Sequence, residues 1–147
     1  MVLFKAIIVP VMCNINFSIG FQINRNLLHN IINNKTDYIS ILEPSDGYVG
    51  VNIKIPIKKE PLEDIFIDEY TYENDEWIVT KTKFMDYIST LSIKEQKKKI
   101  TKSYINTFLV FYSGKVIFSG GISFINRKEA YLVFMDIINR YKDEIKN

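Results

Sequence analysis

Two stretches of strict period-two alternation constrain the fold of this chain more than any other feature. In residues 11–21, "VMCNINFSIGF", apolar side chains fill the odd positions, and asparagine, serine or glycine fills each even position from 14 onward. Residues 48–57, "YVGVNIKIPI", alternate just as regularly. Alternation of this kind is typical of strands that bury one face. The sequence therefore predicts a sheet with one core face, and Pro56 places the second strand at an edge or at the end of its ladder.

Two helical patterns and a hairpin accompany these strands. Residues 23–35, "INRNLLHNIINNK", carry leucine and isoleucine at helical spacing, with Asn24 as the expected N-cap. Residues 126–145 have the apolar stripe of a long amphipathic helix. Between them, "TFLVFY" and "KVIFSGG" read as two strands joined at Ser113-Gly114. The order strand, helix, strand, hairpin, long helix predicts an α+β fold in which two helices cover one face of an antiparallel sheet.

Residues 59–103 do not fit that order, and we interpret them as an insertion in a single domain of residues 1–147. A chain of 147 residues has the usual size of one domain. Within the insertion, "IFIDEYTYENDEWIVTKTKF" predicts a hairpin that turns around residues 73–75. Ser92 and Glu95 have the spacing of a capping box, which predicts a short basic helix. The lysine run 97–99 on that helix is expected to form a solvated face, with phosphate contact as the alternative.

The formal charge of +2 conceals an acidic block. Residues 60–77 contain eight Asp and Glu residues and no Lys or Arg, so the rest of the chain carries +10. A strongly basic chain with one acidic segment is consistent with a polyanion partner. One hypothesis is that the acidic block folds over the basic sheet face when no nucleic acid is bound. The alternative is a solvated hairpin or a surface for a partner protein.

Several functional classes find no support in the sequence. One cysteine and one histidine are too few for a zinc site or a Cys–His dyad without carboxylates, and we predict neither metal nor cofactor. No Gly-rich phosphate loop and no nucleophile with a base at readable spacing is visible, so no catalytic residue and no enzyme are predicted. No apolar run approaches the roughly 18 residues needed to cross a bilayer, and the first residues lack the features of a secretory signal. We therefore expect an intracellular protein with no membrane partner.

The sheet face turned away from the helices is expected to mix amides, hydroxyls, cations and apolar side chains. Its members are Asn14, Asn16, Ser18, Tyr48, Asn52, Lys54, Phe111, Lys115, Ile117 and Ser119. In a DNA minor groove, amides and hydroxyls can bond base-edge acceptors, apolar side chains exclude water, lysines reach phosphate and aromatic wedges enter base steps. A minor-groove surface is one interpretation. Cover by another chain or by residues 59–103 is the other.

Three segments resemble one repeat of the TATA-box-binding protein family. They are "IVP" at residues 8–10 followed by Asn14-Ile15, the Glu43-Pro44 pair before a strand with an aromatic residue and then a cation, and "LVFYSGKVIFSGG" before an amphipathic helix. These elements match the family in order and cover most of the chain except residues 59–103. The resemblance implies a curved antiparallel sheet whose concave side binds and bends A·T-rich DNA, with two helices on the convex side for protein partners. It also implies a role in transcription initiation.

The resemblance assigns DNA-binding roles position by position. Asn14 is similar to the central minor-groove asparagine of the family, and Ser119 stands where a threonine is usual. Phe111 matches one kinking phenylalanine. Tyr48 falls at the other, where its hydroxyl would enter a base step.

The remaining assigned positions lie around these. Lys54 and Lys115 fall on phosphate-contacting positions, and Ile117 falls on an apolar groove contact. Ser18 belongs to the same expected face. Asn16 departs from the family, which has a small apolar groove contact at this position.

The family has two repeats in one chain, whereas this sequence has one. Bending DNA costs free energy, which contacts over a large protein surface must offset. One repeat supplies only half of the saddle-shaped DNA-binding surface of the family, so a second half is needed. The second half is expected from a homodimer that continues the sheet, from another subunit, or from a longer polypeptide. Other transcription initiation factors or RNA polymerase are the expected protein partners. The divergent repeat and the composition rich in Ile, Lys and Asn suggest a large DNA virus, with action in the nucleus or at a viral replication site in the cytoplasm.

Two other functions remain open at this stage. The chain is alternatively a protein–protein adaptor of a transcription complex that has lost DNA binding. A third possibility is a helix-grip binder of a small apolar ligand, with Phe108, Phe118 and Phe134 lining the cavity.

Overall fold

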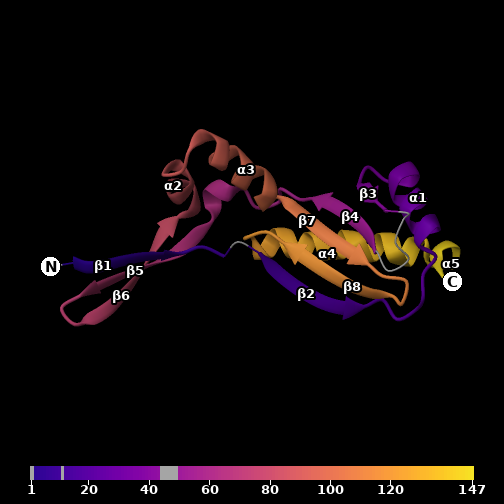
Figure 1. Ribbon diagram of the computed structural model, residues 1–147, viewed down its shortest axis with the longest axis horizontal. Helices are drawn as coiled ribbons and strands as arrows, with labels where there is room; N and C mark the ends of the chain where they lie inside the picture. Colours follow the sequence, from indigo (N-terminus) through magenta and orange to yellow (C-terminus); the bar gives the residue numbers. More distant parts are fainter. Residues whose placement is uncertain (1, 11, 44–49) are drawn as a thin grey trace.

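The computed structural model describes residues 2–10, 12–43 and 50–147 of the chain. Among these residues the strands form two antiparallel sheets (Figure 1). The five-stranded sheet has the order β2 (Cys13–Ser18), β8 (Lys115–Gly120), β7 (Ile105–Val110), β4 (Val51–Pro56) and β3 (Ile39–Ile41). The three-stranded sheet has the order β1 (Val2–Ile8), β5 (Phe66–Glu73) and β6 (Glu76–Lys83). The protein is therefore an α+β fold built on antiparallel sheets, as the sequence predicts.

The helices divide between the two sheets. Buried residues of α1 (Arg25–Lys35), α4 (Phe124–Arg140) and α5 (Lys142–Ile145) share one hydrophobic cluster with the five-stranded sheet. A second cluster joins β5 to the short 3-10 helix η1 (Leu62–Asp64) and α2 (Phe84–Ser89), with α3 (Ile93–Ser103) contributing the half-buried Ile100. Figure 1 shows α4 running behind the five-stranded sheet, and the three-stranded sheet at the N-terminal end of an elongated molecule.

Three phenylalanines fill the space between the five-stranded sheet and α4. Phe108 stacks on Phe118 and on Phe134, with 4.3 Å between ring centroids in each pair. All three side chains are buried. Burial of such a ring contributes about 1.5–3 kcal/mol to stability. The rings pack against one another, so these residues form the core and do not line the ligand cavity considered for a helix-grip protein.

The two alternating strands behave differently. In β4, Val51, Ile53 and Ile55 are fully buried, as the alternation predicts. In β2, Phe17 packs against the core, but Ile15 is 45% exposed. The prediction that every odd position of the first strand is buried is therefore wrong. The reason is the position of β2 at the edge of the sheet, because the buried strand residues of this cluster come from β4, β7 and β8.

The hairpin between β7 and β8 depends on one glycine. Its loop spans residues 112–114, with Phe111 N–H donating to Lys115 O over 2.9 Å. Gly114 has φ +91°, and a Cβ atom there would lie 2.2 Å from the carbonyl oxygen of Phe21. Only glycine therefore fits this turn without moving the backbone.

Several local predictions are confirmed. Asn24 caps α1 by accepting a hydrogen bond from Leu27 N over 3.1 Å. Ser92 caps α3 in the same way through Glu95 N at 3.3 Å. The hairpin of β5 and β6 turns at Asn74 and Asp75, whose φ angles of +52° and +63° are those of a two-residue type I′ turn.

Other elements were not anticipated from the sequence. The first residues form β1, which pairs with β5, so the three-stranded sheet combines the start of the chain with residues 66–83. The short strand β3 and the short helix α2 were also missed.

The chain crosses between the two sheets three times. The three connections run from β1 to β2, from β4 to β5 and from α3 to β7. All three meet the five-stranded sheet at the same end. At this end Cys13 lies opposite Gly120, and Pro56 lies opposite Ile105. A buried amide fastens this junction. Asn126 of α4 accepts from Glu60 N over 2.7 Å and donates to Glu60 O over 2.9 Å.

Half of the eight acidic residues of the block lie in strands of the three-stranded sheet, namely Asp68, Glu69, Glu73 and Glu76. Glu69 pairs with Lys5 of β1 at 2.7 Å, and Asp68 pairs with Lys81 of β6. β5 and β6 therefore do not cover the five-stranded sheet in this structure, contrary to the autoinhibition hypothesis. No helix within the described ranges has both the length and the apolarity to cross a membrane.

Candidate nucleic-acid interface

The candidate site is the face of the five-stranded sheet turned away from α4, which we call the open face. Strand register builds it in three rows. The first row contains Asn14, Ser119, Thr107, Lys54 and Ile39. The second row contains Asn16, Ile117, Leu109, Asn52 and Ile41. The third row contains Ser18, Lys115 and Phe111.

The structure thus brings the predicted site residues together on one surface, with one residue untested. Asn14, Asn16, Ser18 and Lys115 are exposed, and Ile117 is 36% exposed. The side chains of Lys54, Phe111 and Ser119 are half-buried. Tyr48 lies outside the described residues.

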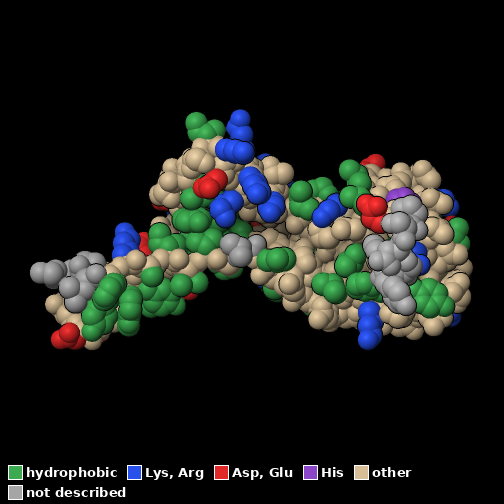
Figure 2. Space-filling view, in the orientation of Figure 1, with side chains coloured by type: hydrophobic (Ala, Val, Ile, Leu, Met, Phe, Trp, Pro, Cys, Tyr) green, Lys and Arg blue, Asp and Glu red, His purple; other side chains and the backbone are tan. Residues whose placement is uncertain are grey.

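The second row gives the open face an apolar character that sequence reasoning missed in part. Ile117 lies opposite Leu109, which was not singled out, and Ile41 at the edge is 47% exposed. Ile39 in the first row is 61% exposed. The signal for Leu109 was available, because it shares the parity of Phe111 within the hairpin. Figure 2, in the same orientation as Figure 1, shows hydrophobic side chains at this surface.

Two hydrogen bonds organise the first row. Ser119 Oγ donates to Asn14 Oδ1 over 2.7 Å, and Lys54 Nζ donates to Thr107 Oγ1 over 3.0 Å. Because Oδ1 of Asn14 already accepts a hydrogen bond, its Nδ2 remains as the group that presents two hydrogens to a ligand. The first row therefore offers an amide donor on β2 and an ammonium group on β4.

The cations of the open face have no ion-pair partner among the residues that the structure describes. Within the described ranges, no carboxylate lies within 4.0 Å of the ammonium group of Lys54 or Lys115, and the ion pairs found involve other lysines and Arg140. Unpaired cations on a surface of amides, hydroxyls and flat apolar side chains suit an anionic partner that also has hydrogen-bond acceptors.

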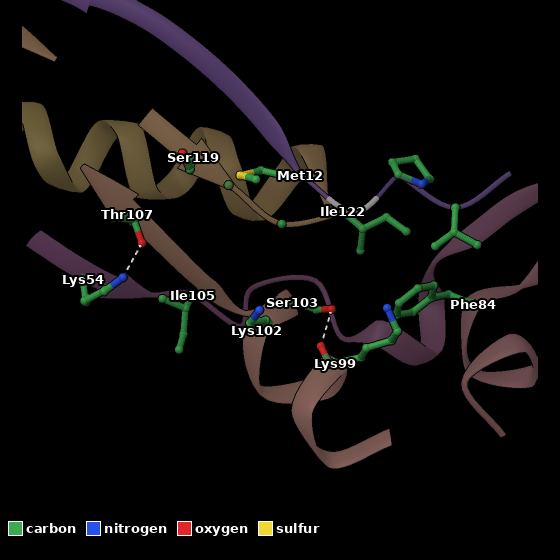
Figure 3. Close-up of a pocket in the computed structure, with 14 residues that line it drawn as sticks. Met12, Lys54, Phe84, Lys99, Lys102, Ser103, Ile105, Thr107, Ser119 and Ile122 are labelled. Carbon is green, nitrogen blue, oxygen red and sulfur yellow. Dashed lines mark hydrogen bonds between the residues drawn. The ribbon is translucent and has the colours of Figure 1, made fainter. Parts of the chain in front are cut away.

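A cavity of about 570 Å³ adjoins the first row of the open face (Figure 3). Lys54, Thr107 and Ser119 line one side of it, and Lys99 and Lys102 of α3 line another. The connection from β1 and the turn after β8 complete the walls. Sequence reasoning identified the lysines of α3 but could not place them beside Lys54, because their sequence separation gives no signal of contact.

The described residues place neither a metal-ligand cluster nor the histidine on the open face. Among residues 2–10, 12–43 and 50–147, no three His, Cys, Asp or Glu side chains are grouped to hold a metal ion. His29 lies on α1 with Nδ1 at 2.9 Å from Ser40 Oγ, away from the open face.

Comparisons with known proteins identify a distant relative. The chain is 31% identical over 144 residues to uncharacterized protein 335L of Invertebrate iridescent virus 6. The match covers 90% of this chain and 41% of that protein, so the chain spans less than half the length of its relative. No family model matches the sequence. No solved structure matches it either.

Proposed function

We propose that the open face binds the minor groove of A·T-rich duplex DNA, and that the protein acts in transcription initiation as a single TATA-box-binding-protein-like repeat. In this proposal the five-stranded sheet is curved, with α1 and α4 on its convex side. The observation that carries the proposal is the alignment of Asn14, Ser119 and Lys54 in one row beside the apolar row of Ile117 and Leu109.

The chemistry of the rows matches the groove. A·T pairs present only acceptors in the minor groove, adenine N3 and thymine O2, and Nδ2 of Asn14 is a free donor. Ile117 and Leu109 form a flat apolar strip that displaces groove water. Lys54 and Lys115 lie on different strands and in different rows, so they reach different phosphates. Phe111 directly follows β7, at a position where a ring can wedge into a base step.

The proposal requires a second sheet that extends the open face, because one repeat supplies only half of the DNA-binding surface. β2 and β3 are the edge strands of the five-stranded sheet, and β3 has only three residues. The six-residue edge of β2 is therefore the better place for a second sheet to continue the first, from a homodimer, another subunit or further polypeptide. The helix side is left for other initiation factors or RNA polymerase. The site of action would be the nucleus or a viral replication site in the cytoplasm.

The test is a binding series with one A·T-rich and one G·C-rich duplex at several salt concentrations. We expect preference for the A·T-rich duplex and an affinity that falls steeply with salt. Phe111→Ala should weaken binding by roughly tenfold to a hundredfold, since contacts of this kind are worth about 1–3 kcal/mol. Phe124→Ala is the matched control, because Phe124 is 67% exposed at the start of α4. Equal affinities for both variants, or no salt-dependent binding, would refute the proposal.

One observation favours a second candidate, the protein–protein adaptor. One face of the three-stranded sheet is apolar and open, with Phe4 63%, Trp77 54% and Val79 53% exposed, and Tyr72 between Phe4 and Trp77 in the register. Figure 2 shows hydrophobic side chains along this sheet. An adaptor would ignore duplex DNA and would show loss of partner or self-association in the variant Trp77→Ser, Val79→Ser. Sedimentation velocity, read beside the duplex binding series, separates the two functions.

A further inference from the structure

Helix α3 carries lysines that lie beside the open face without being part of its sheet. Lys99 and Lys102 line the same cavity as Lys54, Thr107 and Ser119 of the first row. Figure 3 shows these lysines spread along the cavity: Lys54 lies beside Thr107 at one end, and Lys99 of α3 extends toward Phe84 at the other. Three lysines from two separate parts of the fold therefore line one cavity.

The part of the chain that the structure describes places no carboxylate beside the ammonium groups of these lysines. The described residues that line the cavity include three lysines and no Asp or Glu. Within the described ranges, none of the three ammonium groups has a carboxylate within 4.0 Å. Like charges that share a cavity repel one another unless an anion lies between them. The electrostatics of the cavity thus favour an anionic occupant.

The walls of the cavity are held in place by tight backbone contacts. A Cβ atom on Gly121 would lie 2.2 Å from the carbonyl oxygen of Ser103, so the turn after β8 touches the last turn of α3. Tyr104 then accepts from Ile57 N through its carbonyl oxygen over 2.8 Å, and its hydroxyl accepts from Leu62 N over 2.8 Å. The C-terminus of α3 is therefore fixed relative to β4 and β8, and the lysines are presented from a rigid element.

The geometry points to a phosphate-binding site in this cavity, occupied by the duplex backbone where it leaves the first row of the open face. This inference rests on the proposed function and deepens it, because it adds contacts from residues 59–103 that a sheet alone would lack. Neighbouring phosphodiesters of one backbone strand suit lysines that are spread along the cavity, and the side chains of Thr107 and Ser119 lie on the wall beside Lys54. The apolar wall formed by Met12, Phe84 and Ile122 suits the sugar edge of a nucleotide.

The experiment compares two double variants of α3 that lose the same charge. Lys99→Gln, Lys102→Gln removes the two cavity lysines. Lys94→Gln, Lys98→Gln is the matched control, because both lysines are exposed on α3 and do not line the cavity. Each variant is measured for duplex affinity across a salt series. The melting temperature is recorded as well, because Lys102 also lies in the last turn of α3, where a cation stabilises the helix end.

We expect the cavity variant to lose about two units of the slope of log affinity against log salt, since each phosphate contact contributes about 0.9. Its affinity should fall by roughly tenfold at 0.1 M salt, and the control should keep most of the slope. An equal change of the slope in both variants would overturn the inference. It would show that the lysines of α3 act through the general positive charge of the helix and that the cavity is not a specific phosphate site. An unchanged slope in the cavity variant would overturn it as well.

A second arm separates the failure of this inference from the failure of the proposed function. Inorganic pyrophosphate is titrated into the full chain while the amide resonances of Gly120 and Gly121 are followed by NMR. We expect shifts in the wild-type and control proteins and none in the cavity variant. If the wild-type protein binds no duplex but shows these shifts, the proposed function fails and the cavity is a site for a free phosphate compound. If neither duplex nor pyrophosphate is bound, both proposals are wrong.

Discussion

Ser119 donates a 2.7 Å hydrogen bond to Asn14 across the pair of β2 and β8. The bond fixes the amide of Asn14 with its oxygen toward β8 and leaves Nδ2 as the donor on the open face. The orientation of one side chain that we propose to read DNA is therefore set by another. The predictions that follow test this pair, the charge of the face, the turn that shapes it and the junction that supports it.

The Asn14–Ser119 pair predicts a measurable coupling in duplex binding. Asn14→Ala should weaken binding to the A·T-rich duplex by about 1–3 kcal/mol, because it removes the groove donor. Ser119→Ala should cost less, about 0.5–1.5 kcal/mol, because the amide remains but is no longer held. In the double variant the loss should be smaller than the sum of the two. Strict additivity in this double-mutant cycle would show that Ser119 does not orient Asn14.

We expect replacement of Lys115 to change the salt dependence of duplex binding without changing the stability of the fold. Lys115 is exposed at the turn end of β8, with no carboxylate within 4.0 Å among the described residues. Lys115→Gln should lower the salt slope by about 0.9, the contribution of one phosphate contact. Lys128→Gln on α4 is the control, since Lys128 is exposed on the helix. A control slope that falls as much as the Lys115 slope would count against a specific contact.

Gly20 and Gly114 have the same backbone conformation, but we expect their replacement by alanine to lower stability by different amounts. Gly20 has φ +89°, and a Cβ atom there would have no neighbour within 4 Å, whereas at Gly114, with φ +91°, it would lie 2.2 Å from a backbone oxygen. Gly20→Ala should therefore cost about 1–2 kcal/mol, the penalty for the left-handed conformation alone. Gly114→Ala should cost clearly more, because the carbonyl of Phe21 must also move. Urea unfolding of both variants measures the difference, and equal midpoints would show that the turn relaxes freely.

The buried amide of Asn126 predicts a large effect on stability. Asn126 is 2% exposed and bonds both the N–H and the C=O of Glu60, while its own N–H donates to Ser123 Oγ over 3.0 Å. Asn126→Ala should lower the free energy of unfolding by about 2–4 kcal/mol, because two backbone groups lose their partners. Asn139→Ala, an exposed position on the same helix, should change it by less than about 0.5 kcal/mol. Similar losses in the two variants would contradict the role of Asn126 as a junction residue.

Local signals in the sequence were enough to predict the elements of the five-stranded sheet other than β3, and most members of its open face. The alternation of β4 and the helix caps at Asn24 and Ser92 depend on neighbours within a few residues, so pattern alone reveals them. The same holds for the turn at Asn74 and Asp75. Parity along each strand then sorted side chains to one face or the other, which brought Asn14 and Ser119 together before their contact was known.

Long-range pairing explains what the sequence did not reveal. β1 pairs with β5 across more than sixty positions, and its alternation is interrupted by a register shift between Val2 and Phe4. β3 has three residues, too few to show a period. Lys54 and Lys99 line the same cavity beside the first row, and this arrangement depends on the contact between the end of α3 and the turn after β8. The exposure of Ile15 was missed because alternation shows a face but does not show whether a helix covers it.

The three crossings between the sheets enter the five-stranded sheet at the same end, next to Asn14 and Lys54. Three chain segments join the three-stranded sheet to the five-stranded sheet, and Asn126 of α4 holds one of them through its hydrogen bonds with Glu60. A displacement of the three-stranded sheet would therefore act on the ends of β2, β4 and β7, where the first row of the open face lies. A protein bound to the aromatic surface around Trp77 would thus act on the positions of Asn14 and Lys54 through the connections between the sheets.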